Sequence, residues 1–462
     1  MSKKRSLGCK LYIYLLTLCW LFSGYFPEPA SADEGSFSLS GLLQLRYDGR
    51  YLSDDEGEDH KLHQIADIQI KENKWGHLKF TLAGDMIEDI DSLDDDQSDR
   101  TRTIHDTWDS SSHGYLYICQ AEVYELGRLN YARLGRQYVN HELATTHLDG
   151  LNLLLDLDLF GIQIKPFIYA GIPVRLYEDG HYWDATEVGG GAHILLDRST
   201  KITLEHQVIE EDPDIVGTYR ESGKNRYEQS AFAIRQSLLH KGYGYISLFL
   251  LDNSPKNINT RFSLLVDRLD LDIDASYFYQ FKEISETPTS SPYYTGLTGT
   301  IKPYHNFTLD IMKGVYKDRI WVSAGTQWRL LDSGEDETEF NHSYNNQYLA
   351  LIIDDLLMKN VQLSLQADFW QVMDSDNEDD ILSFGGEIAY EKPQTINISL
   401  GSFYSLYRYD YFADADEKTD VYTIYSDVRY YIQPGLYFDA RYELDIYDIY
   451  EHRFVATLGI EI

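Results

Sequence analysis

Residues Glu451 to Ile462 end the chain and read E-H-R-F-V-A-T-L-G-I-E-I. Side chains of a β-strand alternate between two faces, so this stretch predicts an apolar face and a small or polar face. The apolar face carries Phe454, Ala456, Leu458, Ile460 and Ile462, and the other carries Arg453, Val455, Thr457, Gly459 and Glu461. Such a strand needs an apolar medium on one side, a polar interior on the other and a neighbour on each edge, because unpaired edges are not tolerated in lipid. The last strand of a closed membrane barrel meets all three needs.

The same ending resembles the C-terminal assembly signal of bacterial outer-membrane β-barrel proteins, in which apolar residues alternate back from the terminus. That family usually ends in Phe or Trp, whereas this chain ends in Ile462. The resemblance implies that barrel-assembly machinery recognises Phe454, Leu458, Ile460 and Ile462. An edge strand of a soluble sandwich is the alternative.

The start of the chain has the pattern of a secretory signal. A basic head with Lys3, Lys4 and Arg5 precedes an apolar run, and Ala30 and Ala32 then stand at a small-residue cleavage site. We expect residues 1–32 to be a cleaved signal peptide and residues 33–462 to form one outer-membrane barrel domain. Two of the three cysteines lie in the signal, so Cys119 has no partner for an internal disulfide.

Alternating runs dominate the rest of the sequence. Clear examples are residues 270–281, 360–371 and 436–447, where apolar side chains on one face oppose Asp, Glu, Gln and Ser on the other. Short turns alternate with long acidic connections, as outer-membrane barrels require, and the 38 tyrosines suit aromatic girdles. The sequence predicts an all-β protein, a transmembrane antiparallel up-and-down β-barrel of about 22 strands (about 18 to 24). Counting the alternating segments gives about 23, whereas a single-chain bacterial barrel should have an even number of strands. Two short turns follow one another between residues 296 and 345, so we expect the miscounted strand there.

A second resemblance surrounds one outer connection. Residues 133–137 read R-L-G-R-Q and residues 148–151 read L-D-G-L. This is similar to a stretch of porin-like barrels, including the alginate-export group, where such segments flank an outer loop. It implies a porin-like barrel and says nothing of the solute.

No catalytic pattern is present, so we expect no enzyme activity. With 40 Lys and Arg against 75 Asp and Glu, nucleic-acid binding is excluded as a function class. The acidic runs at 91–99 and 374–380 are read as solvated loops, with weak divalent binding as the alternative. His141 and His147 are read as solvated loop histidines. We expect no metal site and no cofactor.

These observations favour a porin-like outer-membrane channel for passive diffusion of small solutes. The alternatives are a barrel that exports a polysaccharide or encloses a periplasmic partner protein such as a cytochrome, and a structural or adhesive barrel without an open pore. The expected partners are membrane lipid, lipopolysaccharide, the assembly machinery and the solutes.

A hairpin within residues 421–447 gives the most specific prediction. With a turn at residues 433–435, Arg429 opposes Asp439, Asp427 opposes Arg441 and Tyr425 opposes Glu443, all on the inner face. Glu443 and Asp445 are then left without a basic partner. The candidate pore-lining residues are Arg133, Glu205, Asp272, Asp274, Asp368, Asp427, Arg429, Asp439, Arg441, Glu443 and Asp445. Their acidic excess predicts a cation-preferring lumen, against the alternative of a neutral pore with acidic loops.

Overall fold

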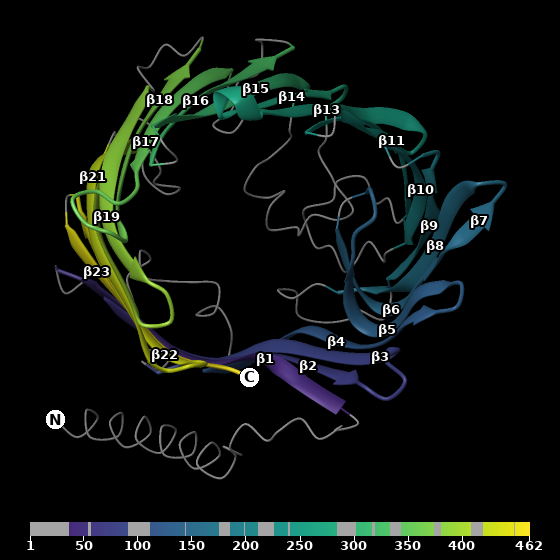
Figure 1. Cartoon of the computed structure of the whole chain (residues 1–462), viewed down its shortest axis with the longest axis horizontal. Helices are drawn as coiled ribbons and strands as arrows, with labels where there is room; N and C mark the ends of the chain where they lie inside the picture. Colours follow the sequence, from purple (N-terminus) through teal and green to yellow (C-terminus); the bar gives the residue numbers. More distant parts are fainter. Residues whose placement is uncertain are drawn as a thin grey trace.

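One antiparallel sheet closes on itself in the computed structural model of the chain (Figure 1). The structure describes residues 37–53, 57–90, 111–143, 145–174, 185–197, 199–210, 226–238, 241–283, 302–316, 319–332, 343–373, 380–407, 419–447 and 449–462. The expected signal peptide and both acidic runs lie outside these residues, apart from Asp380.

The strands follow one another around the ring in chain order. The first half comprises β1 (Phe37–Leu52), β2 (Glu58–Glu72), β3 (Leu78–Asp89), β4 (Ser112–Leu126), β5 (Leu129–Val139), β6 (Thr146–Leu155), β7 (Leu157–Leu159), β8 (Ile162–Pro173), β9 (Thr186–Leu195), β10 (Thr200–Glu210), β11 (Arg226–Leu238) and β12 (Gly242–Leu251). The second half comprises β13 (Ser254–Val266), β14 (Leu271–Gln280), β15 (Tyr304–Tyr316), β16 (Ile320–Leu331), β17 (Tyr344–Ile353), β18 (Val361–Val372), β19 (Ile381–Lys392), β20 (Ile396–Tyr407), β21 (Thr419–Gln433), β22 (Leu436–Ile446) and β23 (Tyr450–Glu461), with a 3₁₀ turn, η4, at Asp267–Leu269.

The first and last strands seal the ring. β1 pairs with β23 in an antiparallel register that runs from Leu42 opposite Glu461 to Leu52 opposite Glu451. Beyond it, the Gly41 and Ile462 backbones exchange two hydrogen bonds, of 3.1 and 2.9 Å. The described strands therefore leave no open edge, which is the condition for a sheet to lie in lipid.

The barrel has 22 strands, although 23 segments are labelled, and this confirms the predicted class and number. β6 and β7 both pair with β8 and are one strand interrupted at Asp156. The predicted position of the miscounted strand, between residues 296 and 345, is therefore wrong, because the extra segment is β7. The strands described within that range are β15, β16 and the start of β17.

Large apolar side chains stay on the surface of this barrel. Phe454 and Phe438 are 39% and 41% exposed, and similar residues recur on strands all round the ring. Apolar surface in water costs about 25 cal/mol per Å². The only buried apolar cluster found among the described residues is small and comprises Val139, Leu148, Phe167 and Tyr169. A sheet with this distribution is stabilised by an apolar surrounding rather than by a conventional core.

Within the described residues, no helix is both long and apolar enough to cross a membrane.

Candidate functional site: the inner face of the barrel

The connection between β5 and β6 shows which face of the sheet is inside. Figure 1 draws this connection within the ring. The backbone N–H groups of Glu142 and Leu143 each donate a 2.8 Å hydrogen bond to Glu205 on β10. Tyr245 on β12 donates its hydroxyl hydrogen to the Glu142 carboxylate. The connection therefore crosses β6, β8 and β9 on the inside, and we call the face bearing Tyr169, Glu205 and Tyr245 the inner face.

Strand register carries this assignment around the barrel, because opposed residues share a face. One row of opposed residues passes through Tyr169, Asn152, Arg133, Glu122, Lys79, Lys71 and Ser38. Ion pairs along this row, of 2.7 Å from Lys79 to Glu122 and 3.1 Å from Arg133 to Glu122, confirm that these side chains meet. Since Arg46 and Asp48 alternate in step with Ser38 on β1, they also lie on the inner face.

All eleven candidate residues fall on this inner face when the register is followed strand by strand. Arg133 lies on β5, Glu205 on β10, Asp272 and Asp274 on β14, and Asp368 on β18. The other six lie on β21 and β22. Their role in lining a pore stays a prediction.

The register predicted for the β21–β22 hairpin is confirmed. Arg429 opposes Asp439, Asp427 opposes Arg441 and Tyr425 opposes Glu443. The turn residues are Pro434 and Gly435, and Gly435 has a φ of +80°, a left-handed conformation that glycine adopts without strain. A bulge at Ile432 places Gln433, the remaining residue of the predicted turn, opposite Leu436.

One inference from that hairpin is wrong. Glu443 does have a basic partner, since Nη2 of Arg441 lies 2.6 Å from its carboxylate. Arg441 thus pairs along its own strand, two residues away, instead of across to Asp427. Asp445 receives a hydrogen bond from the Thr423 hydroxyl. Among the described residues, no hydrogen bond or ion pair of Asp427 is found.

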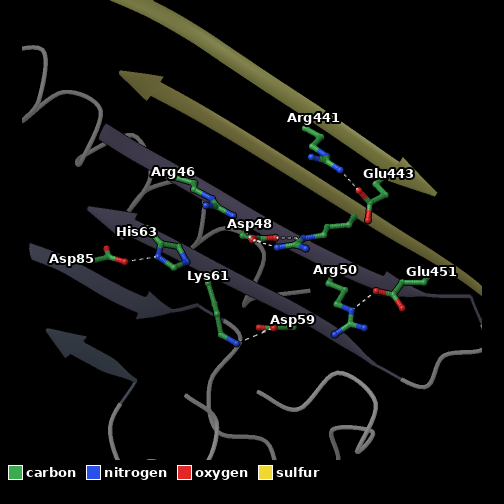
Figure 2. Close-up of polar contacts among 11 residues, drawn as sticks. Arg46, Asp48, Arg50, Asp59, Lys61, His63, Asp85, Arg441, Glu443 and Glu451 are labelled. Atoms are coloured by element: carbon green, nitrogen blue, oxygen red, sulfur yellow. Dashed lines mark hydrogen bonds and ion pairs between the residues drawn. The ribbon is translucent and has the colours of Figure 1, made fainter. Parts of the chain in front are cut away.

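Charged pairs gather where the barrel closes, on strands β21, β22, β23, β1 and β2, which we call the closing seam. Figure 2 shows several of these pairs. Asp48 on β1 binds two guanidinium groups, with Arg453 at 2.9 Å and Arg46 at 3.0 Å. Arg429 lies 2.7 Å from Asp439. Guanidinium and carboxylate groups therefore alternate over this part of the inner face.

Further charged pairs lie at β1 and β2 and extend to the neighbouring strand β3. Arg50 binds Glu451, and Lys61 lies 2.9 Å from Asp59. His63 lies 2.9 Å from Asp85 on β3 (Figure 2). The sequence-based selection did not include these residues of β1 and β2. The run L-Q-L-R-Y-D-G-R at residues 43–50 alternates clearly enough to have included Arg46, Asp48 and Arg50.

Glu205 is the centre of the second polar cluster on the inner face. Its side chain is buried at 4% exposure, and besides the two backbone donors it accepts a 2.9 Å hydrogen bond from Tyr169. The neighbouring Glu187 accepts hydrogen bonds from Thr146 and Gln207. A buried carboxylate is stable only when such donors satisfy it, so Glu205 is an anchor for the β5–β6 connection.

His141 differs from the solvated loop residue that was predicted. Its ring stacks on Phe167 with 3.7 Å between ring centroids, and burial lowers its pKa to about 4. His147 is half-buried and stacks on Tyr138. No group of His, Cys, Asp and Glu able to hold a metal ion is found among the described residues. The correction for His141 follows from the inward path of the connection, which has no local sequence pattern, whereas His147 is not in a loop but on β6.

The R-L-G-R-Q and L-D-G-L segments meet across β5 and β6. Arg136 makes a bidentate pair with Asp149, at 2.8 and 2.7 Å, and Gln137 donates to the Gly150 carbonyl at 3.0 Å. A Cβ on Gly150 would lie 2.1 Å from the Ala170 carbonyl oxygen, so only glycine fits there. In this chain the motif fastens the strands that flank the inward connection.

The four residues of the expected assembly signal lie where the strand pattern placed them. Phe454, Leu458 and Ile460 on β23 oppose Gly49, Leu45 and Leu43 of β1, on the face away from the inner face. Ile462 follows the strand and is held by the backbone bonds to Gly41. Recognition by assembly machinery stays a prediction.

No protein-family model and no curated protein matches the chain. Solved structures do match it. The translocation pore of the P pilus usher PapC aligns with 91% of this chain and 100% of its own, at 8% identity and a TM-score of 0.51. Pseudomonas aeruginosa OccK1 aligns with 92% of this chain and 99% of its own, at 10% identity and a TM-score of 0.45. Acinetobacter baumannii OccAB4 covers 94% and 100%, at 9% identity and a TM-score of 0.42.

The likeness to the usher pore shows a shared barrel fold. No family model and no sequence family supports the resemblance to the alginate-export group.

Proposed function

We propose that this chain is a porin-like channel of the bacterial outer membrane, through which small solutes diffuse passively. The supporting observation is a closed barrel whose inner face carries water-accessible charged groups while large apolar side chains cover the opposite face. On the closing seam the side chains of Arg429, Arg441 and Arg453 are 41%, 51% and 46% exposed. Charged groups that retain access to water indicate a hydrated interior, as in porins.

Selectivity for cations is the finer part of the proposal. Each candidate arginine is already paired: Arg133 with Glu122, Arg429 with Asp439 and Arg441 with Glu443. No ion pair or hydrogen bond is found for the Asp272, Asp368 and Asp427 carboxylates among the described residues. Unpaired carboxylates on the inner face attract counter-ions, so mobile cations should outnumber anions there.

Planar-bilayer recordings of the purified full-length mature protein test both parts. We expect stable conductance and a reversal potential of cation sign across a KCl gradient. Combined Asp272→Asn, Asp368→Asn and Asp427→Asn should shift the reversal potential toward zero. Asp197→Asn is the control, because Asp197 lies in the turn between β9 and β10 and bonds locally to Ser199 and Thr200. An anion preference of the unmodified protein, or a cation preference that the triple variant retains in full, would contradict the proposed selectivity.

The same recordings separate the channel from a structural or adhesive barrel, which has no open pore and would show no stable conductance. Lipid, lipopolysaccharide and the assembly machinery remain the proposed partners of the channel, along with its solutes.

A further inference from the structure

Three rows of opposed residues, most of them charged, cross the closing seam. Each row is given in the strand order β21, β22, β23, β1 and β2. The first row is Arg429, Asp439, Thr457, Arg46 and His63. The second row is Asp427, Arg441, Val455, Asp48 and Lys61, and the third row is Tyr425, Glu443, Arg453, Arg50 and Asp59. In the second row the charge changes sign from strand to strand on either side of β23, and in the first row it changes sign between Arg429 and Asp439. Between the first and second rows the charge also changes sign on β21, β22 and β1. β23 itself contributes the uncharged Thr457 and Val455 at the centre of those rows.

The uncharged residues make the floor of a slot between two charged walls. Arg46 and Asp48 of β1 form one wall, and Asp439 and Arg441 of β22 form the other. Because neighbouring strands lie about 4.8 Å apart, the backbones of the two walls are about 10 Å apart. The floor residues and the side chains of Arg46, Asp439 and Arg441 border a concavity of about 460 Å³. The slot is therefore large enough for a small organic ion.

The two walls present opposite charges to one another at both levels. Arg46 faces Asp439 across Thr457, and Asp48 faces Arg441 across Val455. A solute with one positive and one negative group can satisfy both walls, whereas a simple anion or cation places its single charge beside one repulsive group. Alternation of this kind favours a dipolar solute over a singly charged one.

Polar groups at the slot have unused bonding capacity. Nε of Arg46 is buried and has no hydrogen-bond partner among the described residues. The Asp427 carboxylate also borders the concavity and has no partner among the described residues. The Asp427 carboxylate is thus left as an acceptor for a bound molecule, and the Arg46 and Arg441 side chains border the same concavity.

We propose that the concavity of this slot, bordered by Val455, Thr457, Arg46, Asp427, Asp439 and Arg441, is a binding site for small zwitterionic solutes. A carboxylate of the solute binds the guanidinium groups of Arg441 and Arg46, and its ammonium group binds Asp439 and Asp427. The site deepens the proposed channel function and rests on it, because it names the solute class that the channel would favour.

Current interruptions in planar bilayers measure binding to this site. The probe is 4-aminobutanoate, compared with butanoate and butylammonium at fixed ionic strength and neutral pH, where each of the latter carries one of its two charges. We expect the zwitterion to bind at least tenfold more tightly than either singly charged probe. Equal affinities in a conducting channel would overturn the binding site alone. Absence of conductance would instead overturn the channel function on which the site rests.

Two variants locate the effect. Val455→Phe should fill the slot without changing any charge and should reduce zwitterion affinity at least tenfold. Ala350→Phe is the matched control, because Ala350 lies on the inner face of β17, remote from the seam, and should leave affinity unchanged. Arg441→Gln removes one wall charge and should reduce the preference even if Val455→Phe fails to assemble. Slower migration of the unheated protein on a detergent gel would identify such a failure. A preference that survives in both assembled variants would overturn the proposal.

Discussion

At the scale of single residues, the Glu205 side chain joins distant segments of the chain. It accepts hydrogen bonds from the N–H groups of Glu142 and Leu143 and from the hydroxyl of Tyr169. Hydrogen bonds to a charged group contribute about 1.5–3 kcal/mol each. Its removal should release the β5–β6 connection from the inner face.

Glu205→Ala is therefore expected to raise single-channel conductance and current noise, since the released connection no longer has a fixed position across β6, β8 and β9. Amide hydrogen exchange at Leu143 should accelerate at least tenfold. Tyr169→Phe is the control, because it removes one of three donors and should have a smaller effect. Unchanged exchange at Leu143 would show that Glu205 is not the anchor.

His141 gives this connection a dependence on pH. Its pKa is lowered to about 4 by burial, below the value of about 6.5 for an exposed histidine. Because the docked state binds fewer protons, docking is fully stable above about pH 6.5 and weakens as the pH falls toward 4. Current noise should therefore increase between pH 7 and pH 5. His141→Phe keeps the stacking on Phe167 and should remove the change, whereas an equal increase in that variant would rule out His141.

At the scale of strands, the two faces of β23 can be compared directly. Leu458 lies on the apolar face and Thr457, its neighbour, lies on the inner face. A charge facing lipid at mid-membrane depth costs about 2–4 kcal/mol for Arg or Lys and less for Asp.

Leu458→Asp should lower the amount of assembled protein in the membrane fraction, while Thr457→Asp should not. Immunoblots of membrane fractions, with heated and unheated samples, measure both. Normal levels of Leu458→Asp would mean that the two faces are reversed or that the strand does not meet lipid.

The strands show how far the sequence could predict the structure. Alternation defined them, and Pro434 and Gly435 fixed the β21–β22 register because the turn determines which residues oppose. Partner choice within that register was not predictable, since Arg441 can reach either Asp427 across the strands or Glu443 along its own. Two further features depend on contacts between distant segments: the slot on β1, β22 and β23, and the docking of the β5–β6 connection. The interruption at Asp156 leaves no clear signal in the alternating pattern.

At the scale of the whole molecule, the exposed apolar face predicts how the protein behaves in detergent. It should stay in the membrane fraction through washes with high salt and urea. The unheated barrel should migrate faster than the boiled chain on a detergent gel, because the closed sheet resists unfolding. Release by urea alone would contradict a lipid-facing surface.

The pairing of β1 with β23 also determines the order in which barrel closure and solute binding can occur during assembly. One wall of the slot comes from the beginning of the described chain, whereas the floor and the other wall come from its end. Before β23 is in place, the two walls of the slot lie on opposite edges of an open sheet, on β1 and β22, and the floor between them is missing. Solute binding at the slot would therefore occur only in barrels that have closed. An assembly intermediate without the β1–β23 pairing would not bind the solute, even if it conducted ions.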